Sequence, residues 1–150
     1  MKKFTACLLA ATALTMAAPA SAQFSKPENA IKYRQSAMFM MAQNFGRVAG
    51  MANGRIPFDA KVAADSAALA EVMSKLPWEG FVPGTDSGKT KAKPEIWTNK
   101  AKFDDHAKKM QTEMAKLAVA AKSGNLDNIK LAVKATGAAC ESCHDDFQAN

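Results

Sequence analysis

Apolar residues recur at three- and four-residue steps through most of this 150-residue chain, and this spacing limits its fold more than any other feature. Such spacing places apolar side chains on one face of an α-helix. No segment shows the alternation of apolar and polar residues that indicates a β-strand, and no unit repeats at a fixed length. The sequence therefore predicts an all-α protein, folded as an antiparallel four-helix bundle.

The first two expected helices have clear start and stop signals. The first runs from about residue 27 to 52, where Ser25 and Glu28 could form a capping box and Asn53-Gly54 ends the helix. The second opens at Asp59, a good N-cap residue, and continues until Pro77 stops it. The residues at helical spacing are Ile31, Met38, Met41, Phe45 and Val48 in the first helix, and Val62, Ser66, Leu69, Val72, Met73 and Leu76 in the second.

An irregular stretch over residues 77–97 separates these helices from two more. Connections longer than ~15 residues are unusual unless they are functional or packed by their own side chains. Trp78, Phe81 and Trp97 therefore suggest that this stretch folds back over the domain. The third helix is expected from about residue 98 to 123, and the fourth from an Asn125 cap to about Phe147. Their periodic residues are Phe103, Met110, Met114 and Leu117, then Leu126, Ile129 and Val133.

The first 22 residues have the layout of a secretory signal peptide. A basic start at Lys2 and Lys3 precedes an apolar run, and Ala20-Ser21-Ala22 forms a small-residue cleavage site. We expect cleavage between Ala22 and Gln23, which leaves one domain over residues 23–150 in the periplasm. No later segment approaches the ~20 continuous apolar residues of a membrane helix, so no membrane insertion is expected.

The only cysteines beyond this signal are Cys140 and Cys143, and His144 follows them at once. The spacing C-x-x-C-H is typical of covalent c-type haem attachment. On a helix these three positions share one face. Each thiol could then add to one haem vinyl group while His144 binds the iron as axial ligand. We expect one covalent haem c per chain.

Other chemistries of this motif fit the sequence less well. A thioredoxin-like pair opens a helix after a strand, whereas this pair lies late in a helical segment. A zinc site would need His106, the only other histidine, and lacks the usual paired-ligand spacing. His106 could also serve as a second haem ligand, but it lies among charged residues, which favours a surface position.

The chain carries a formal net charge of +6, and its lysines are spread along the sequence. Nucleic-acid binding calls for a clustered basic face, so no nucleic-acid partner is expected. A mild positive charge could help the protein meet an acidic redox partner protein.

Together these features resemble the class II c-type cytochromes, specifically the cytochrome c′ family, over the whole length after residue 22. The resemblance implies a bundle that is usually a homodimer packed through its first two helices. It also implies a five-coordinate, high-spin haem that binds NO and CO but discriminates against O₂. No distal His–Arg pair is evident, so no enzymatic activity is expected. Besides the C-x-x-C-H motif, the matching segments are Gln23-Phe-Ser-Lys-Pro-Glu, Tyr33-Arg34-Gln35-Ser36, Leu76-Pro-Trp78, Phe81-Val-Pro-Gly-Thr85 and Lys93-Pro-Glu-Ile-Trp97.

The resemblance also implies roles for individual residues. Arg34 and Gln35 would lie near the haem edge and its propionates, the alternative for Arg34 being an ordinary surface position. Glu95 would lie in the loop that approaches the haem, or on the surface. Met38 matches the bulky apolar residue that shields the distal face. In related low-spin members a methionine near this position ligates the iron instead, which would make the protein purely an electron carrier. Gln148 stands where many relatives carry a basic residue, a departure that calls proximal NO binding into question.

Overall fold

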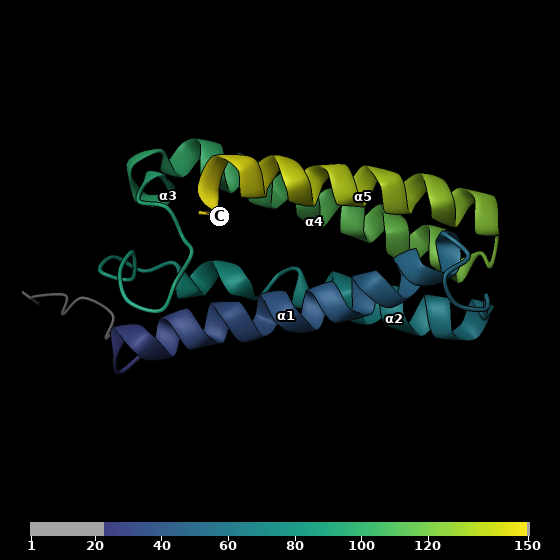
Figure 1. Ribbon diagram of the computed structural model, residues 1–150, viewed down its shortest axis with the longest axis horizontal. Coiled ribbons are helices and arrows are strands. Elements are labelled where there is room, and N and C mark those ends of the chain that lie inside the picture. The colour runs from purple at the N-terminus through teal and green to yellow at the C-terminus, as the bar shows by residue number, and fades with distance from the viewer. Residues whose placement is uncertain (1–22, 150) are drawn as a thin grey trace, which may run out of the picture.

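The computed structural model describes residues 23–149, so the expected signal peptide and its cleavage site lie outside the described residues. Four long helices run antiparallel to one another, and two short helices lie in the connection between the second and third of them (Figure 1). This confirms the predicted all-α four-helix bundle. In chain order the elements are α1 (Pro27–Ala52), α2 (Ala60–Met73), the 3-10 helix η1 (Pro77–Gly80), α3 (Glu95–Thr98), α4 (Lys100–Lys122) and α5 (Leu126–Phe147).

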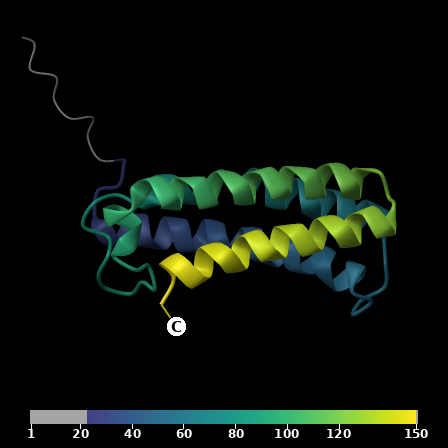
Figure 2. The ribbon, with the colours of Figure 1, turned by 90° about the horizontal axis from the view of Figure 1, so that it is seen from above.

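The four long helices close into a ring around one apolar core. Helix α1 packs on α2, α2 on α4, α4 on α5, and α5 returns to α1. Figure 2, seen from above, shows α4 and α5 side by side in front of α1 and α2. The predicted faces of α4 and α5 are buried as expected, except for Leu126 at the start of α5, which is half-buried. Fully buried side chains at the centre of the core include Val48, Met114, Leu117 and Ile129.

Helix α1 buries most of its predicted apolar face. Ile31, Met41 and Val48 are buried, whereas Met38 and Phe45 on the same face are only half-buried. The spacing of apolar residues in the sequence does not distinguish the three buried positions from the two half-buried ones. The two half-buried residues line the cavity described below, so the helical face continues from core into cavity wall without a break in the pattern.

Helix α2 turns small side chains inward and large ones outward. Its buried residues are Ala63, Ser66, Ala67 and Ala70. Val62, Leu69 and Val72, which share the helical spacing, are 39, 50 and 51% exposed. Exposed apolar side chains gathered on one helix are typical of an interaction surface.

The helix ends follow the predicted caps in two of three cases. The side-chain oxygen of Asp59 accepts a hydrogen bond from the Val62 N–H at 2.9 Å, and Asn125 caps α5 in the same way. The predicted capping box of α1 is wrong, because Lys26 occupies the N-cap and makes no side-chain cap. Ser25 instead accepts a hydrogen bond from the side-chain amide of Asn29 at 3.1 Å, which removes it from the backbone.

Helix α2 ends at Met73, before Pro77, the residue that the sequence suggested would stop it. Ser74 donates its hydroxyl to the Glu71 carbonyl at 2.6 Å, a local bond that competes with helix propagation. The indole N–H of Trp78 then donates to the Ser74 carbonyl at 2.7 Å. This bond anchors η1 directly after the helix.

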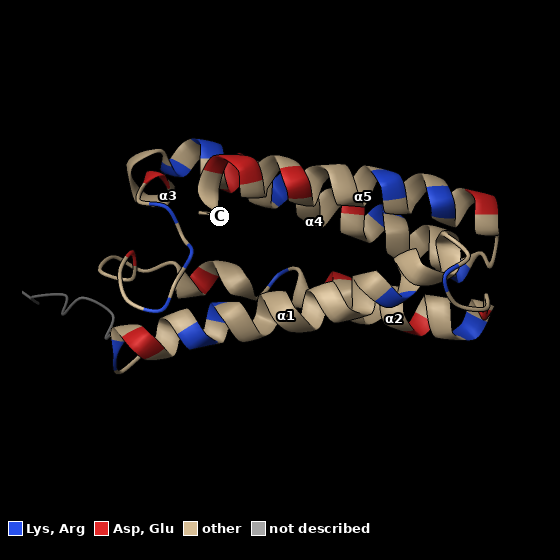
Figure 3. Cartoon of the chain, in the orientation of Figure 1, with Lys and Arg blue, Asp and Glu red and all other residues tan. Residues whose placement is uncertain are grey.

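Within residues 23–149, none of the helices combines the length and apolar composition that a bilayer crossing requires. Lys and Arg are interspersed with Asp and Glu along the helices (Figure 3). Several of these charges pair within one helix, as between Lys61 and Asp65 at 2.6 Å. Such exposed pairs contribute little to stability.

The 3-10 helix η1 lies against α1 at a distance that only glycine permits. A Cβ atom at Gly80 would lie 2.8 Å from the Ala30 carbonyl oxygen and 2.9 Å from the Arg34 Cβ. Both neighbours belong to the body of α1 and cannot turn away as a flexible side chain would. Gly80 therefore sets how closely the long connection approaches α1.

Replacing Gly80 by Ala should lower the free energy of unfolding by on the order of 1–3 kcal/mol, because the added methyl group overpacks this contact. Gly46→Ala is the matched control, since a Cβ there meets no atom within 4 Å. It lies inside α1 on an exposed face and should raise the free energy of unfolding by about 0.5–1 kcal/mol. Urea unfolding followed by circular dichroism would measure both. A Gly80→Ala protein as stable as the parent would contradict the proposed contact.

Candidate haem site

An apolar cavity of about 590 Å³ opens where the first half of α1 faces the second half of α5. Its walls also include η1, the long connection and α4. Aromatic and methionine side chains make up about half of the lining, among them Met38, Phe45, Trp78, Phe81 and Phe103. All three residues of the predicted attachment motif, Cys140, Cys143 and His144, line the same cavity.

The motif lies in the last two turns of α5, and its spacing of three and four residues places its side chains on one face. Both cysteines are half-buried free thiols. Burial raises the pKa of the Cys140 thiol, and burial together with Cys140 and Asp146 raises the pKa of Cys143 to about 11. A redox-active pair needs the opposite shift, toward thiolate. The site therefore lacks the electrostatics of a thioredoxin-like centre.

The other histidine lies outside this cavity. His106 Nε2 is 3.0 Å from Asp146 Oδ2, and the imidazole packs edge-on against Phe147. Only 14% of its side chain is exposed, so the expected surface position is corrected to a half-buried, paired one. Among residues 23–149, no group of three or more His, Cys, Asp or Glu side chains is placed to hold a metal ion. The alternative zinc site is therefore not formed in this part of the chain.

The cavity residues fit haem c in their chemistry. Two thiols three positions apart match two vinyl groups, and His144 supplies an imidazole for the iron. Aromatic and aliphatic walls suit the faces of a porphyrin, which are apolar. The lining also holds two basic side chains, Arg34 and Lys91, and no acidic one. Such a lining suits a group that is apolar over most of its area and carries carboxylates at one edge.

Met38 lines the cavity from α1, while His144 lines it from α5. The α1 residues beside Met38 in the lining are Phe39, Met41, Ala42 and Phe45. None of these side chains carries an N–H or O–H donor. Beyond Gln35, the α1 wall can therefore offer a bound ligand steric contact but no hydrogen bond.

Arg34 is buried, with 2% exposed, which excludes the surface position considered for it. Its Nη1 donates to the Gly80 carbonyl at 2.8 Å and to Thr85 Oγ1 at 2.6 Å. Its Nη2 donates to the Thr85 carbonyl at 2.6 Å and to Thr90 Oγ1 at 2.9 Å. The guanidinium carbon lies 4.6 Å from the centre of the Phe81 ring. Burial lowers the pKa of Arg34, but an arginine stays charged.

The other two polar residues predicted for the site differ in position. Gln35 lines the cavity, and its amide donates to the Lys89 carbonyl at 2.8 Å. Glu95 is exposed at the first residue of α3 and does not line the cavity, although its neighbour Ile96 does. The structure thus brings together all the predicted site residues except Glu95.

The sequence did not single out Thr85, Thr90 or Lys91. Thr85 is fully buried and accepts two bonds from Arg34, and Thr90 and Lys91 line the cavity. The proline- and glycine-rich composition around them marked a connection but not its path. Their positions depend on the fold of that connection around Arg34, which no local pattern encodes.

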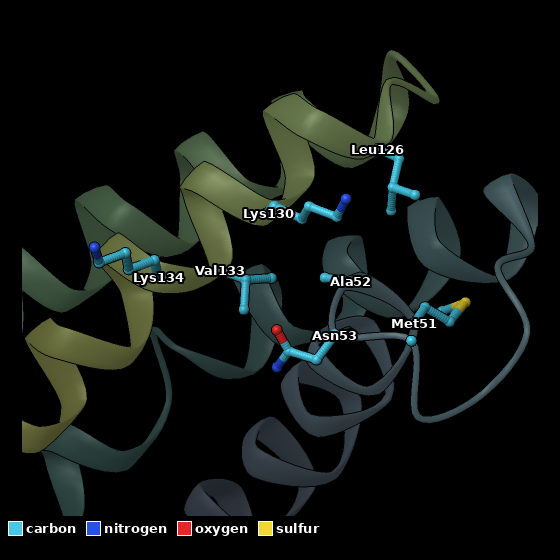
Figure 4. A pocket seen from close by; sticks show the side chains of 8 residues that line it. Met51, Ala52, Asn53, Leu126, Lys130, Val133 and Lys134 are labelled. Carbon is cyan, nitrogen blue, oxygen red and sulfur yellow. The ribbon is translucent and has the colours of Figure 1, made fainter.

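A second cavity of about 700 Å³ lies at the opposite end of the bundle, between the end of α1 and the start of α5 (Figure 4). Met51, Asn53, Leu126, Lys130 and Val133 are among its lining residues. It contains no thiol and no imidazole. Of these two cavities, only the first therefore holds residues that could attach a haem.

Known proteins share both the sequence and the fold of this chain. The sequence profile of the cytochrome c′ family matches residues 29–148. The cytochrome c′ of Rubrivivax gelatinosus is 52% identical, over 84% of this chain and 98% of that protein. The structure of cytochrome c′ from Shewanella frigidimarina aligns with a TM-score of 0.82 at 44% identity, over 85% of this chain and 99% of that one.

A nitric oxide complex of a mutant cytochrome c′ from Alcaligenes xylosoxidans aligns equally well. Its TM-score is 0.80 at 40% identity, over 85% of this chain and 99% of that chain. These matches extend over almost the whole described chain and include the helix that carries Cys140, Cys143 and His144. The chain therefore belongs to the cytochrome c′ family of covalent haem c proteins.

Proposed function

We propose that this chain is a periplasmic haem c protein whose iron is bound by His144 and left open on the opposite side, where it binds NO and CO. The observation that carries the proposal is the α1 wall around Met38, which offers bulk and no hydrogen-bond donor. The nitric oxide complex of the related Alcaligenes protein supports the same ligand here. Residues 1–22 would direct export and then be removed before Gln23.

Cys140 and Cys143 would hold the haem through two thioether bonds. Each bond forms when one S–H adds across one vinyl double bond, so the thiol hydrogen passes to the vinyl group. Two such bonds on one face of α5 would hold the haem beside His144, which follows Cys143 and lies one turn from Cys140.

The apolar wall also supports the expected discrimination between gases. Haem proteins that hold O₂ depend on distal polarity and hydrogen-bond donors, and steric access decides which ligands enter. Met38, Phe39 and Phe45 supply steric contact alone. We therefore propose that the site favours NO and CO over O₂. His144 is the only histidine in the lining and Arg34 is engaged with the connection, which supports a binding protein over an enzyme.

An alternative rests on the thioether of Met38. This side chain lines the wall across from His144, and sulfur is an established second axial ligand in cytochromes. An iron with both positions filled would transfer electrons and bind no gas. The positive charge of the chain would suit an acidic redox partner in either case.

We further propose that two copies of the chain associate through α1 and α2. The support is a set of large, exposed apolar side chains on these helices and the turn between them. Burying them would remove apolar surface from water, which favours association. The set comprises Phe39, Met40, Ile56, Phe58, Val62, Leu69 and Val72.

The optical spectrum separates the open iron from the Met-ligated one. An open iron should give a broad Soret band in the reduced protein, and this band should sharpen when CO is added. A sharp α band that CO leaves unchanged would show that both axial positions are filled. That result would replace gas binding with the electron-carrier function.

Replacing Met38 by Ala should raise the CO association rate by on the order of tenfold, equivalent to about 1.4 kcal/mol in the barrier. The reason is the removal of side-chain bulk from the wall opposite His144. Met40→Ala is the matched control, because Met40 lies on α1 but is exposed and outside the lining. Flash photolysis would measure both rates. Equal rates in the parent and the Met38→Ala protein would rule out Met38 as a steric gate.

A charge placed on the α2 surface should break the dimer. Leu69→Glu would bury a carboxylate at the interface, so the protein should elute as a monomer at concentrations where the parent is dimeric. Leu131→Glu is the control, because Leu131 is 70% exposed on α5, away from the proposed interface. Size-exclusion chromatography with light scattering gives the masses. A dimeric Leu69→Glu protein would place the interface elsewhere.

A further inference from the structure

The polar residues of the haem cavity gather at one place in its lining. Thr90 and Lys91 come from the long connection, Gln35 hydrogen-bonds to the same connection at the Lys89 carbonyl, and Gln148 pairs with it through Ala92. The rest of the lining is apolar apart from Arg34 and the attachment motif. A haem carries two propionate carboxylates, and burying a carboxylate without a partner is costly. This polar corner is where the cavity can accept them.

Most donors at this corner already have partners within the protein. The two terminal nitrogens of Arg34 meet four acceptors, which matches the four N–H bonds that they carry. The Gln35 amide donates to the Lys89 carbonyl, and Thr90 Oγ1 accepts from both Arg34 and the Ala92 N–H. Lys91 differs from all of these. Its ammonium group makes no hydrogen bond or ion pair to any side chain or carbonyl within residues 23–149.

The backbone around Lys91 is held firmly, although its side chain is free. Residues 90–93 form a strap across the end of α5. The Ala149 N–H donates to the Lys91 carbonyl at 2.8 Å, and the Lys93 N–H donates to the Phe147 carbonyl at 3.0 Å. The Lys93 ammonium group also donates to the Asp145 carbonyl at 2.9 Å. The strap therefore fixes Lys91 beside the helix end that carries His144.

We propose that Lys91 is the cation that pairs with a haem propionate. The proposal rests on the haem attachment at Cys140 and Cys143 proposed above. Arg34 is then a positioning residue, which folds the connection so that the strap reaches α5. Lys91 supplies the mobile charge that Arg34, with its terminal N–H groups engaged, does not. An ammonium–carboxylate pair at the edge of an apolar cavity is screened less than one on an open surface.

The reduction potential of the haem reports on this pair. An unpaired propionate leaves a negative charge near the iron, and this charge stabilises the ferric form over the ferrous form. Lys91→Gln should therefore lower the midpoint potential. Lys91→Arg keeps the charge and should stay near the parent value. Lys89→Gln is the matched control, since Lys89 is on the same connection with the same charge but its side chain does not line the cavity.

The test uses the purified holoprotein and spectroelectrochemical titration at low and high salt. Circular dichroism of Lys91→Gln should match the parent, because the backbone carbonyl of residue 91 makes the strap bonds. Support requires that Lys91→Gln lowers the potential, that the two controls do not, and that salt reduces the difference. A potential equal to the parent's, or a Lys89→Gln shift as large as that of Lys91→Gln, overturns the proposal. Chains that retain no haem under denaturing conditions would refute the attachment at Cys140 and Cys143 instead.

Discussion

The buried guanidinium of Arg34 holds the long connection against α1, and the haem cavity takes its shape from that contact. A charge removed from water is tolerated only when its hydrogen bonds are satisfied. Arg34 meets this condition through carbonyl and hydroxyl oxygens of the connection and through the face of Phe81. Gly80 allows the close approach that brings these acceptors within reach. This network acts together with the strap bonds to α5 in holding residues 77–97 over the end of the bundle.

The same helical pattern builds both a packed core and the wall of the haem cavity. In the middle of the bundle, Val48, Leu117 and Ile129 pack with the small side chains of α2 into one apolar core. Earlier along α1 than Val48, Met38 and Phe45 continue the same face but meet the cavity. The difference comes from the partner elements, since η1, the long connection and the end of α5 face these two side chains across the cavity. One apolar stripe therefore serves both stability and cofactor binding.

The sequence predicted the four long helices, the Asp59 and Asn125 caps and the attachment motif, because each depends on a local pattern. It could not separate Met38 from Val48, since both lie on the same helical face and only tertiary structure makes one a cavity wall and the other core. Ser25 fitted the pattern of a capping box, but its hydroxyl accepts a hydrogen bond from the Asn29 side chain instead. Lys91 carried no signal, because its position depends on the strap pairing with the end of α5. Apart from the local bond between Ser25 and Asn29, the features that the sequence did not predict depend on contacts between residues far apart in the chain.

The position of the attachment motif bears on whether the haem is attached before or after the chain folds. In the folded bundle, Cys140 and Cys143 are half-buried behind α1 and the strap, where an enzyme that joins haem to thiols has poor access. An apolar hollow left unfilled also weakens a folded protein. Both constraints are met if the haem is joined while the helices are still apart. The bundle then closes around a porphyrin already tethered to α5, so that maturation and folding become one coupled process.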